Sequence, residues 1–265
     1  MYVDRSEELG LEIEPVAGEA AAIAVSATGR RFLVVCDLHL GLTDRLGLFR
    51  PRPDEEAEEM KERLLDTAFR MQTNEVLILG DVKHGLYGPS NHERTAIRLL
   101  TRSLAKEMRV WVVKGNHDFR IEEDVDPHVT LISSGGLTID DCLLFHGHAL
   151  PSRRTVLVCY ETVVSGHIHP QVYGRGEWER VWLILNAQSA DLKPKEVVVL
   201  PHFNDYASRV GYMPGPPIMI TPYLRRLNLS NYEARILNLD GKTMERGLAR
   251  DMVSHMNDSS GAGRI

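Results

Sequence analysis

The sequence has few cysteines, no excess of positive charge and no long apolar run. Its three cysteines, Cys36, Cys142 and Cys159, show no paired spacing, which is typical of reduced thiols rather than of a disulfide framework. The formal net charge is −6, so no overall basic field draws the chain to nucleic acid or to an anionic membrane. No apolar run approaches the roughly 20 residues of a membrane span, and the acidic amino terminus is unlike a secretory signal. We therefore expect a cytoplasmic protein without membrane contact.

A chain of 265 residues, of which 43% are hydrophobic, can bury one large core. The sequence contains no internal repeat and no interdomain linker. We expect a single domain over residues 1–243, followed by a polar tail over residues 244–265. Because the tail has too little apolar surface to pack, we expect it to be partly disordered.

The first half of the chain alternates strand-like and helix-like segments. Ile23–Val25 and Phe32–Cys36 are short apolar runs that can pair as strands. A helix is expected from Pro53, because three acidic residues follow it and negative charge favours a helix amino terminus. A second helix is expected from Ser90, which can form a capping box with the glutamate three residues later. Residues 32–113 therefore follow a β-α-β-α-β pattern, typical of parallel strands with crossover helices.

In the second half, short apolar runs follow one another with little room for helices. They are Val129–Ile132, Leu137–Ile139, Leu143–Phe145, Val163–Val164, Val181–Leu185, Val197–Leu200 and a last strand within Asn231–Asn238. We expect these runs to form a second, mixed sheet that packs on the first. The expected fold class is α/β, as a four-layer α-β-β-α sandwich of two mixed sheets flanked by helices.

Five short polar segments each follow a strand-like apolar run, and seven of the eleven histidines lie in them. The segments are Asp37-Leu-His39, Gly80-Asp-Val-Lys-His84, Gly115-Asn-His-Asp118, His146-Gly-His148 and Gly166-His-Ile-His169. All five are expected at strand ends, where loops can bring them together. Oxygen and imidazole ligands in this number suit two divalent cations rather than one.

Several of these residues are suited to hold a cation. Asp37 and His39 are two positions apart, so on an extended segment they point to the same side. Asp81 follows a strand and a glycine, and its carboxylate can bridge two metals with its two oxygens. The remaining candidate ligands are Asn116, His146, His167 and His169. His117 would be displaced toward the substrate.

Taken alone, each segment also has an ordinary structural explanation. The pair His146 and His148 can lie in a turn with one imidazole bonded to backbone. Gly115–Asp118 can form a hairpin turn, and His167 and His169 can end a buried strand. The occurrence of all five segments in order at strand ends favours the metal site over these separate explanations.

These motifs resemble those of the calcineurin-like metallophosphoesterase superfamily, whose ordered signature is D-x-H, G-D-x-x-(H/D), G-N-H-(D/E), a downstream His and G-H-x-H. The resemblance spans residues 37–169. It implies a first metal on Asp37, His39 and His169, a bridging Asp81, and a second metal on Asn116, His146 and His167. It also implies that His117 is the catalytic histidine, and it agrees with the two-sheet fold.

The implied mechanism uses two cations held ~3.5–4 Å apart. A hydroxide between them would attack phosphorus in line, while the cations neutralise the phosphate oxygens. His117 or His84 would donate a proton to the leaving oxygen. We expect Mn²⁺, although the ligand set also suits Fe²⁺, Zn²⁺, Co²⁺ or Ni²⁺.

The substrate expected from the sequence is a phosphodiester. The segment Gly80-Asp-Val-Lys-His84, followed by Phe145-His-Gly-His-Ala-Leu-Pro151, resembles the archaeal and bacterial proteins related to the double-strand-break repair nuclease, including DNA-ligase-associated metallophosphoesterases. This resemblance implies DNA or RNA ends as substrates and an association with DNA repair proteins. Lys83, Arg153 and Arg154, together with other basic residues near the motifs such as Lys114 and Arg120, are candidate phosphate contacts.

Two other functions are compatible with the sequence. One is a phosphodiesterase or phosphatase for a small metabolite, with no role on nucleic acid. The other is a non-catalytic scaffold, which the intact set of predicted ligands disfavours. The sequence gives no indication of the oligomeric state.

Overall fold

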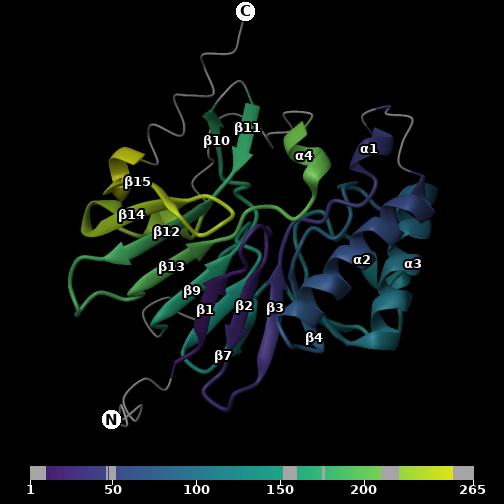
Figure 1. The fold of residues 1–265 in the computed structure, drawn as a ribbon, viewed down its shortest axis with the longest axis horizontal. Coiled ribbons are helices and arrows are strands. Elements are labelled where there is room, and N and C mark those ends of the chain that lie inside the picture. Colours follow the sequence, from purple (N-terminus) through teal and green to yellow (C-terminus); the bar gives the residue numbers. More distant parts are fainter. Residues whose placement is uncertain are drawn as a thin grey trace, which may run out of the picture.

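A computed structural model of the chain describes residues 10–45, 47, 52–151, 160–174, 177–209 and 221–252 (Figure 1). Two large sheets face each other. The first has the strand order β1-β2-β3-β4-β5-β6, with β1 to β3 antiparallel and β3 to β6 parallel. Its strands are β1 (Glu12–Pro15), β2 (Ala22–Val25), β3 (Arg31–Val35), β4 (Glu75–Leu79), β5 (Arg109–Val113) and β6 (Thr130–Ile132).

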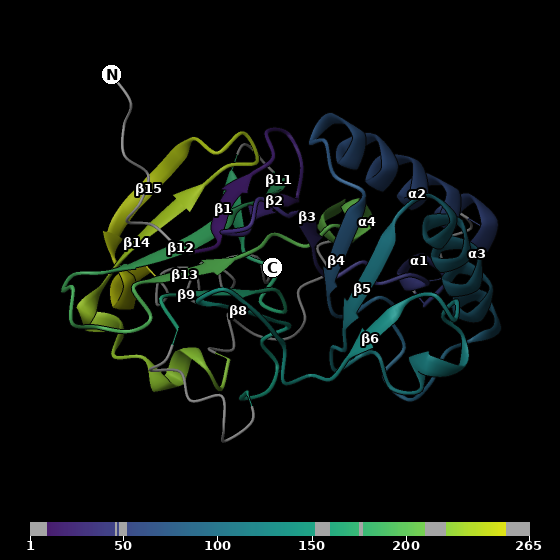
Figure 2. The same cartoon turned by 90° about the horizontal axis from the view of Figure 1, so that it is seen from below.

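Two long helices cover the outer face of the first sheet (Figure 2). Helix α2 (Pro53–Arg70) begins at a proline, and its first turn is acidic. Helix α3 (Asn91–Glu107) begins after Ser90, whose hydroxyl accepts from the Glu93 N–H at 3.2 Å while the Glu93 carboxylate accepts from the Ser90 N–H. Both helices lie where the sequence predicts them, and the β-α-β-α-β unit is confirmed.

The second sheet has seven strands in the order β15-β14-β12-β13-β9-β8-β7. They are β7 (Leu137–Ile139), β8 (Cys142–Phe145), β9 (Thr162–Ser165), β12 (Trp182–Ala187), β13 (Glu196–Val199), β14 (Tyr232–Leu237) and β15 (Thr243–Leu248). Strands β8, β9 and β13 are parallel, and the other pairs are antiparallel. The predicted α/β class with two large mixed sheets is therefore confirmed.

Alternate residues of the central strands pack into different cores. In β3, Leu33 and Val35 face α2 and α3, whereas Phe32 and Val34 face the second sheet. A third apolar cluster lies on the outer face of the second sheet, where Tyr223 covers it. Because both faces of β3 are buried beyond Arg31, the strand is continuously apolar from Phe32 to Val35 rather than alternating.

The remaining described elements are short. They are α1 (Leu42–Arg45), α4 (Asp205–Arg209), the hairpin β10 (Gln171–Gly174) and β11 (Glu177–Arg180), and three single 3-10 turns, Ile121–Glu123, Leu224–Arg226 and Leu229–Asn231. Within the described ranges, no helix is long and apolar enough to cross a membrane.

Two sequence expectations need correction. The run Val129–Ile132 was expected in the second sheet, but β6 pairs in parallel with β5 and extends the first sheet. Residues 243–248 form β15, which begins at the boundary drawn for the polar tail. An edge strand is hydrogen-bonded to one neighbour only and can therefore form from a polar sequence. A cross-strand ion pair between Arg246 and Glu233 adds to the pairing of β15 with β14. The part of the expected tail beyond residue 252 lies outside the described residues.

A buried glutamate at the start of β4 is hydrogen-bonded to Arg30, directly before β3, and to Trp111 in β5. Glu75, only 5% exposed, accepts hydrogen bonds from Arg30 Nε at 2.7 Å and from Trp111 Nε1 at 3.0 Å. The Arg30 guanidinium also lies 4.7 Å from the centre of the Phe32 ring. The hydrogen bonds from Arg30 outweigh burial and hold the pKa of the Glu75 carboxyl below its ordinary value of 4.5.

We expect Glu75→Gln to lower the free energy of unfolding by about 1–2 kcal/mol near neutral pH, because the charged acceptor is lost. Since the folded-state pKa is lowered, the carboxylate stabilises the protein above about pH 4.5 and loses this contribution as the pH falls further. The difference between wild type and variant in urea unfolding should therefore shrink toward acidic pH. An equal difference at every pH would contradict this assignment.

Candidate metal centre

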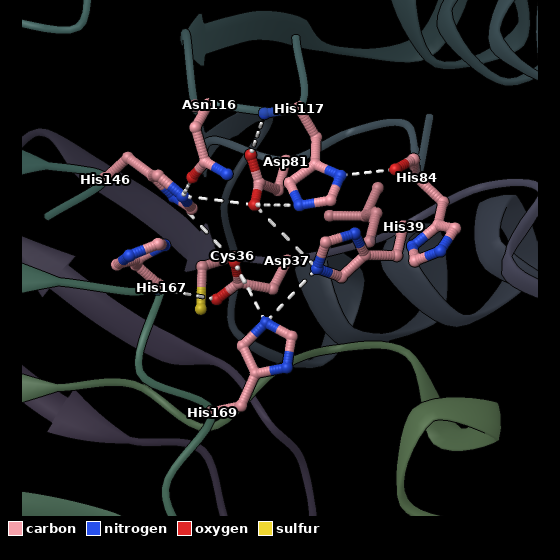
Figure 3. A network of polar contacts seen from close by, with 12 residues as sticks. Cys36, Asp37, His39, Asp81, His84, Asn116, His117, His146, His167 and His169 are labelled. Carbon is pink, nitrogen blue, oxygen red and sulfur yellow. Dashed lines mark hydrogen bonds and ion pairs between the residues drawn. The ribbon is translucent and has the colours of Figure 1, made fainter. Parts of the chain in front are cut away.

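The five polar segments converge at one place between the two sheets (Figure 3). Three of them follow the carboxyl ends of β3, β4 and β5 in the first sheet, and two follow β8 and β9 in the second. Parallel strands place their carboxyl ends at the same edge of a sheet, and the two edges face each other here. The predicted meeting of these segments is therefore found in the structure.

The first group of candidate ligands is Asp37, His39 and His169. The Nε2 atoms of the two histidines lie 3.2 Å apart, and His169 Nε2 is 3.3 Å from Asp37 Oδ1. Among the described residues, Asp37 Oδ1 is buried without a hydrogen-bond donor, whereas Asp37 Oδ2 accepts from the His167 N–H at 3.0 Å. One carboxylate oxygen and two imidazole nitrogens thus point at a common position, as a divalent cation requires.

The second group is Asp81, His146 and His167. His146 Nδ1 donates to the Leu79 carbonyl at 2.8 Å, which leaves Nε2 to face Asp81 Oδ2 at 3.2 Å and Asn116 Oδ1 at 3.2 Å. A backbone carbonyl that fixes the tautomer in this way is common behind metal-binding histidines. All seven predicted ligands therefore lie in these two groups or beside them.

Asp81 lies between the two groups, but only one of its oxygens faces both. Its Oδ2 is 3.2 Å from His146 Nε2 and 3.8 Å from His39 Nε2. Its Oδ1 accepts a hydrogen bond from the His117 N–H at 2.8 Å. Oδ2 therefore faces both groups, and Asp81 would contribute this oxygen to a bound cation.

The charges at this centre favour bound cations. Burial alone would raise the pKa of Asp37, but His169, His146 and His39 hold it well below its ordinary value. Burial alone would lower the pKa of His146, but Asp81 and Asp37 raise it to about 10. The two buried carboxylates thus attract positive charge at this centre. Divalent cations would supply the same charge, so the donor set and its electrostatics fit the predicted metals.

The backbone at the candidate ligands is not extended. Eight described non-glycine residues have positive φ, and five of them are candidate ligands: Asp37, His39, Asp81, His167 and His169. The left-handed conformation is costly for residues with a side chain and tends to occur at functional sites. Asp37 and His39 therefore meet through a left-handed turn and not through the alternation of an extended strand, which corrects the explanation drawn from their spacing.

Glycines allow the segments to approach closely. Gly80 has φ 82°, and a Cβ atom there would lie 2.5 Å from Cγ of His146. A Cβ at Gly115 would overlap the Asp81 carboxylate, and one at Gly166 would lie 2.7 Å from Asp37 Oδ2. A larger residue at any of these three positions would displace a candidate ligand.

The two predicted catalytic histidines lie beside the first group. His117 Nδ1 donates to the His84 carbonyl, and its Nε2 faces Asp81 Oδ2 at 3.9 Å. The rings of His84 and His117 are stacked with centroids 5.5 Å apart. Both rings lie near His39, at 5.4 and 4.9 Å, and one nitrogen from each of the three lies within 4.8 Å of the others. The hydrogen bond to His84 leaves His117 Nε2 directed into the centre.

Lys83 does not have the position expected for a substrate contact. Its side chain is fully buried, and its ammonium donates to the carbonyls of Gly85 and His117. It thereby joins the loop after β4 to the loop after β5. The sequence shows that Lys83 lies inside a motif, but it does not show that the side chain is buried. Arg153 and Arg154 lie outside the described residues.

Asp118 is an important residue to which the sequence analysis assigned no role. Its carboxylate is fully buried and accepts from the N–H groups of Asp81 and Gly115 at 2.8 Å and from that of Val82 at 2.9 Å. Burial and the charge of Asp81 raise the pKa of Asp118 to about 6. One sign of this role in the sequence is that Asp118 is the last residue of the Gly115–Asp118 segment.

Two further histidines border the centre. His202 is buried after β13 and stacks on His169, with ring centroids 4.8 Å apart. His148 is half-buried, with its ring 5.2 Å from that of His146. His148 belongs to a quoted motif, whereas His202 stands alone in the sequence and carries no pattern that could have revealed it.

Comparisons with known proteins bear on the family and the fold of the chain. A sequence profile of calcineurin-like phosphoesterases matches residues 30–232, and no curated protein sequence matches the chain significantly. The crystal structure of a Pseudomonas putida nuclease, MPE, aligns over 86% of this chain and 98% of its own, with 16% identity and a TM-score of 0.50. The E. coli phosphoesterase YfcE aligns over 82% of this chain and 98% of its own, with 16% identity and a TM-score of 0.38. The nuclease structure thus has a similar fold.

We expect Asp118→Asn to weaken Mn²⁺ binding about 10- to 100-fold, because either orientation of the amide places its NH₂ against a backbone N–H. Isothermal titration calorimetry would measure the dissociation constant, with Asp191→Asn on an exposed loop as the matched control. An unchanged dissociation constant would show that Asp118 does not position the metal loops.

We expect Lys83→Met to lower the free energy of unfolding by about 1–3 kcal/mol, because two carbonyls lose their donor. The variant should lose kcat with little change in KM, since the ammonium anchors His117 and does not reach the substrate. Thermal unfolding and steady-state kinetics would measure the two effects. A raised KM with unchanged stability would restore the substrate contact predicted from the sequence.

Proposed function

This chain belongs to the calcineurin-like phosphoesterase family, and we propose that within it the chain is a dinuclear phosphodiesterase that acts on nucleic acid or nucleotide diesters. As a member of the family it is a metal-dependent phosphoesterase. The observation that carries the finer proposal is the pair of ligand groups on either side of Asp81 Oδ2, with His117 and His84 beside them. We further propose Mn²⁺ as the resident metal, and the carboxylate and amide oxygens among the donors support this choice.

In this proposal the first cation lies on Asp37, His39 and His169, and the second on Asn116, His146 and His167. Asp81 lies between them. When bound, two such cations lower the pKa of coordinated water and neutralise phosphate oxygens. The buried carboxylates of the chain hold these charges in place, and Asp118 holds the two loops that carry Asp81 and Asn116.

The proposed acid is His117. Its Nδ1 proton is held by the His84 carbonyl, so in the protonated ring Nε2 carries the proton that can pass to the leaving oxygen. His84 stacks on His117 and presents its own ring toward the same side of the centre. His84 would contact the phosphate or the leaving group. We therefore propose that the leaving group lies on the side of the metal centre where His84 and His117 lie.

A diester with a nucleic acid component is favoured by the segment Asp81-Val-Lys-His84, which resembles that of the nuclease and phosphodiesterase branches of the family. The Pseudomonas putida protein of this fold is named a nuclease. An association with DNA repair proteins, which the resemblance implies, is part of the same proposal.

One observation favours a small-metabolite diester instead. Two described cations that flank the Gly115–Asp118 segment are already paired: Lys114 with Glu122 at 2.8 Å and Arg120 with Glu123 at 2.6 Å. A nucleic acid backbone would meet little free positive charge from these two residues, and the whole chain carries a net charge of −6. A small nucleotide diester needs no such surface, so it is the second candidate.

We expect the Mn²⁺-loaded protein to hydrolyse bis-p-nitrophenyl phosphate faster than p-nitrophenyl phosphate, and His117→Ala to lose about 10²- to 10⁴-fold in kcat. His128→Ala is the matched control, because His128 is an exposed histidine before β6. Metal content should fall to zero with chelator and return to two ions per chain. Hydrolysis of the monoester alone would reject the diesterase, and full activity in His117→Ala would reject the proposed acid.

A further inference from the structure

Large apolar side chains are exposed around the candidate metal centre. Nine such residues are exposed among those that the structure describes, and five of them lie in the loops that carry the candidate site residues or directly after them. These five are Leu86, Tyr87, Phe119, Leu150 and Tyr173. The other four lie on the helices α2 and α3 and on the edge strand β15.

The opposite edge of the same sheets differs. The turns before β3, β4 and β8 comprise residues 26–30, 71–74 and 140–141, and none of the described residues in them is an exposed large hydrophobic. The two ends of the sandwich are built from the same strands, so strand packing does not account for the difference. Exposed apolar groups gathered at one site are typical of a surface that binds another molecule.

Two of these residues form what we call the aromatic pair, Tyr87 and Phe119. Tyr87 is 94% exposed and lies three residues after His84, whereas Phe119 is 57% exposed and lies two residues after His117. The loops that carry them follow β4 and β5, which are hydrogen-bonded neighbours. The rings of His84 and His117 are stacked 5.5 Å apart, so the aromatic pair belongs to the same two loops as the residues on the proposed leaving-group side.

The charges beside the centre indicate what these rings would bind. Lys83 is buried against carbonyls, and Lys114 and Arg120 are paired with glutamates, so these cations add little to the affinity for a phosphate backbone. The candidate metal groups can bind only the phosphate that reacts. Affinity for the rest of a nucleotide would then have to come from the bases, whose faces stack on aromatic side chains.

We propose that Tyr87 and Phe119 stack on unpaired nucleobases next to the phosphodiester, which makes them specificity-determining residues for the substrate. This inference rests on the proposed function and narrows the class of substrate to unpaired nucleotides. A base inside a duplex has both faces covered by its neighbours and could not stack on these rings. The substrate is therefore an unpaired nucleotide diester, in a single strand or in a small nucleotide.

The first test measures binding without turnover. Fluorescence anisotropy in chelator would compare a labelled single-stranded thymidine oligonucleotide, the same strand with abasic positions, and a duplex. We expect the single strand to bind most tightly, and Tyr87→Ala and Phe119→Ala each to weaken its binding about 5- to 100-fold. Tyr87→Phe keeps the ring and should retain the affinity.

Phe69→Ala is the matched control, because Phe69 is an aromatic residue that is 84% exposed near the end of α2. It should leave binding unchanged, and the abasic strand should bind equally weakly to every variant. Binding of the duplex as tight as that of the single strand, or the same loss with the abasic strand as with thymidine, would overturn the proposal.

The second test uses the Mn²⁺-loaded enzyme with the oligonucleotide and with a dinucleoside monophosphate. A rise in KM for both substrates in the alanine variants supports stacking of a small nucleotide diester, and a rise for the oligonucleotide alone supports stacking along a strand. No rise for either would overturn the proposal. Hydrolysis of bis-p-nitrophenyl phosphate by the wild type tests the diesterase activity separately, so its absence would reject the proposed function without bearing on base-dependent binding in chelator.

Discussion

The burial of two carboxylates is the constraint on which the rest of this structure depends. Asp37 and Asp81 are 0% and 2% exposed, and a buried carboxylate without compensation costs several kcal/mol. Backbone N–H groups of His167 and His117 donate to them, and histidine nitrogens surround their other oxygens. This arrangement attracts positive charge, and the family to which the chain belongs uses divalent cations. The negative charges of Asp37 and Asp81 therefore underlie both the metal chemistry and the stability of the centre.

The same constraint explains the unusual backbone around the centre. Five candidate ligands adopt left-handed conformations, which cost about 1 kcal/mol or more each and persist only where surrounding contacts hold them. Asp118 holds the loops after β4 and β5, and Asn204 Nδ2 donates to the Leu38 carbonyl at 2.7 Å. The inter-sheet core beneath these loops, with Leu79 and Val113, is fully buried. Hydrogen bonds and packing thus compensate for the strain in the turns.

Much of the fold and of the candidate site could be predicted because the relevant signals are local. The capping box at Ser90 depends on a residue only three positions later, and each polar segment follows its strand closely. Features that depend on which residues meet in the folded protein could not be predicted from local sequence. The inward turn of Lys83, the sheet to which β6 belongs, and the stacking of His202 on His169 follow from tertiary contacts. The strand β15 was missed because an edge strand needs no apolar periodicity.

Both candidate ligand groups combine residues from the two sheets, and this has a consequence for folding. His169 of the second sheet faces Asp37, which is 132 residues earlier in the first. Contacts of such long sequence separation form slowly, because the intervening chain must first be closed into a loop. A cation that binds only the assembled centre stabilises the folded state by mass action. Metal supply would then add to the free energy that holds the two sheets together, in addition to supporting catalysis.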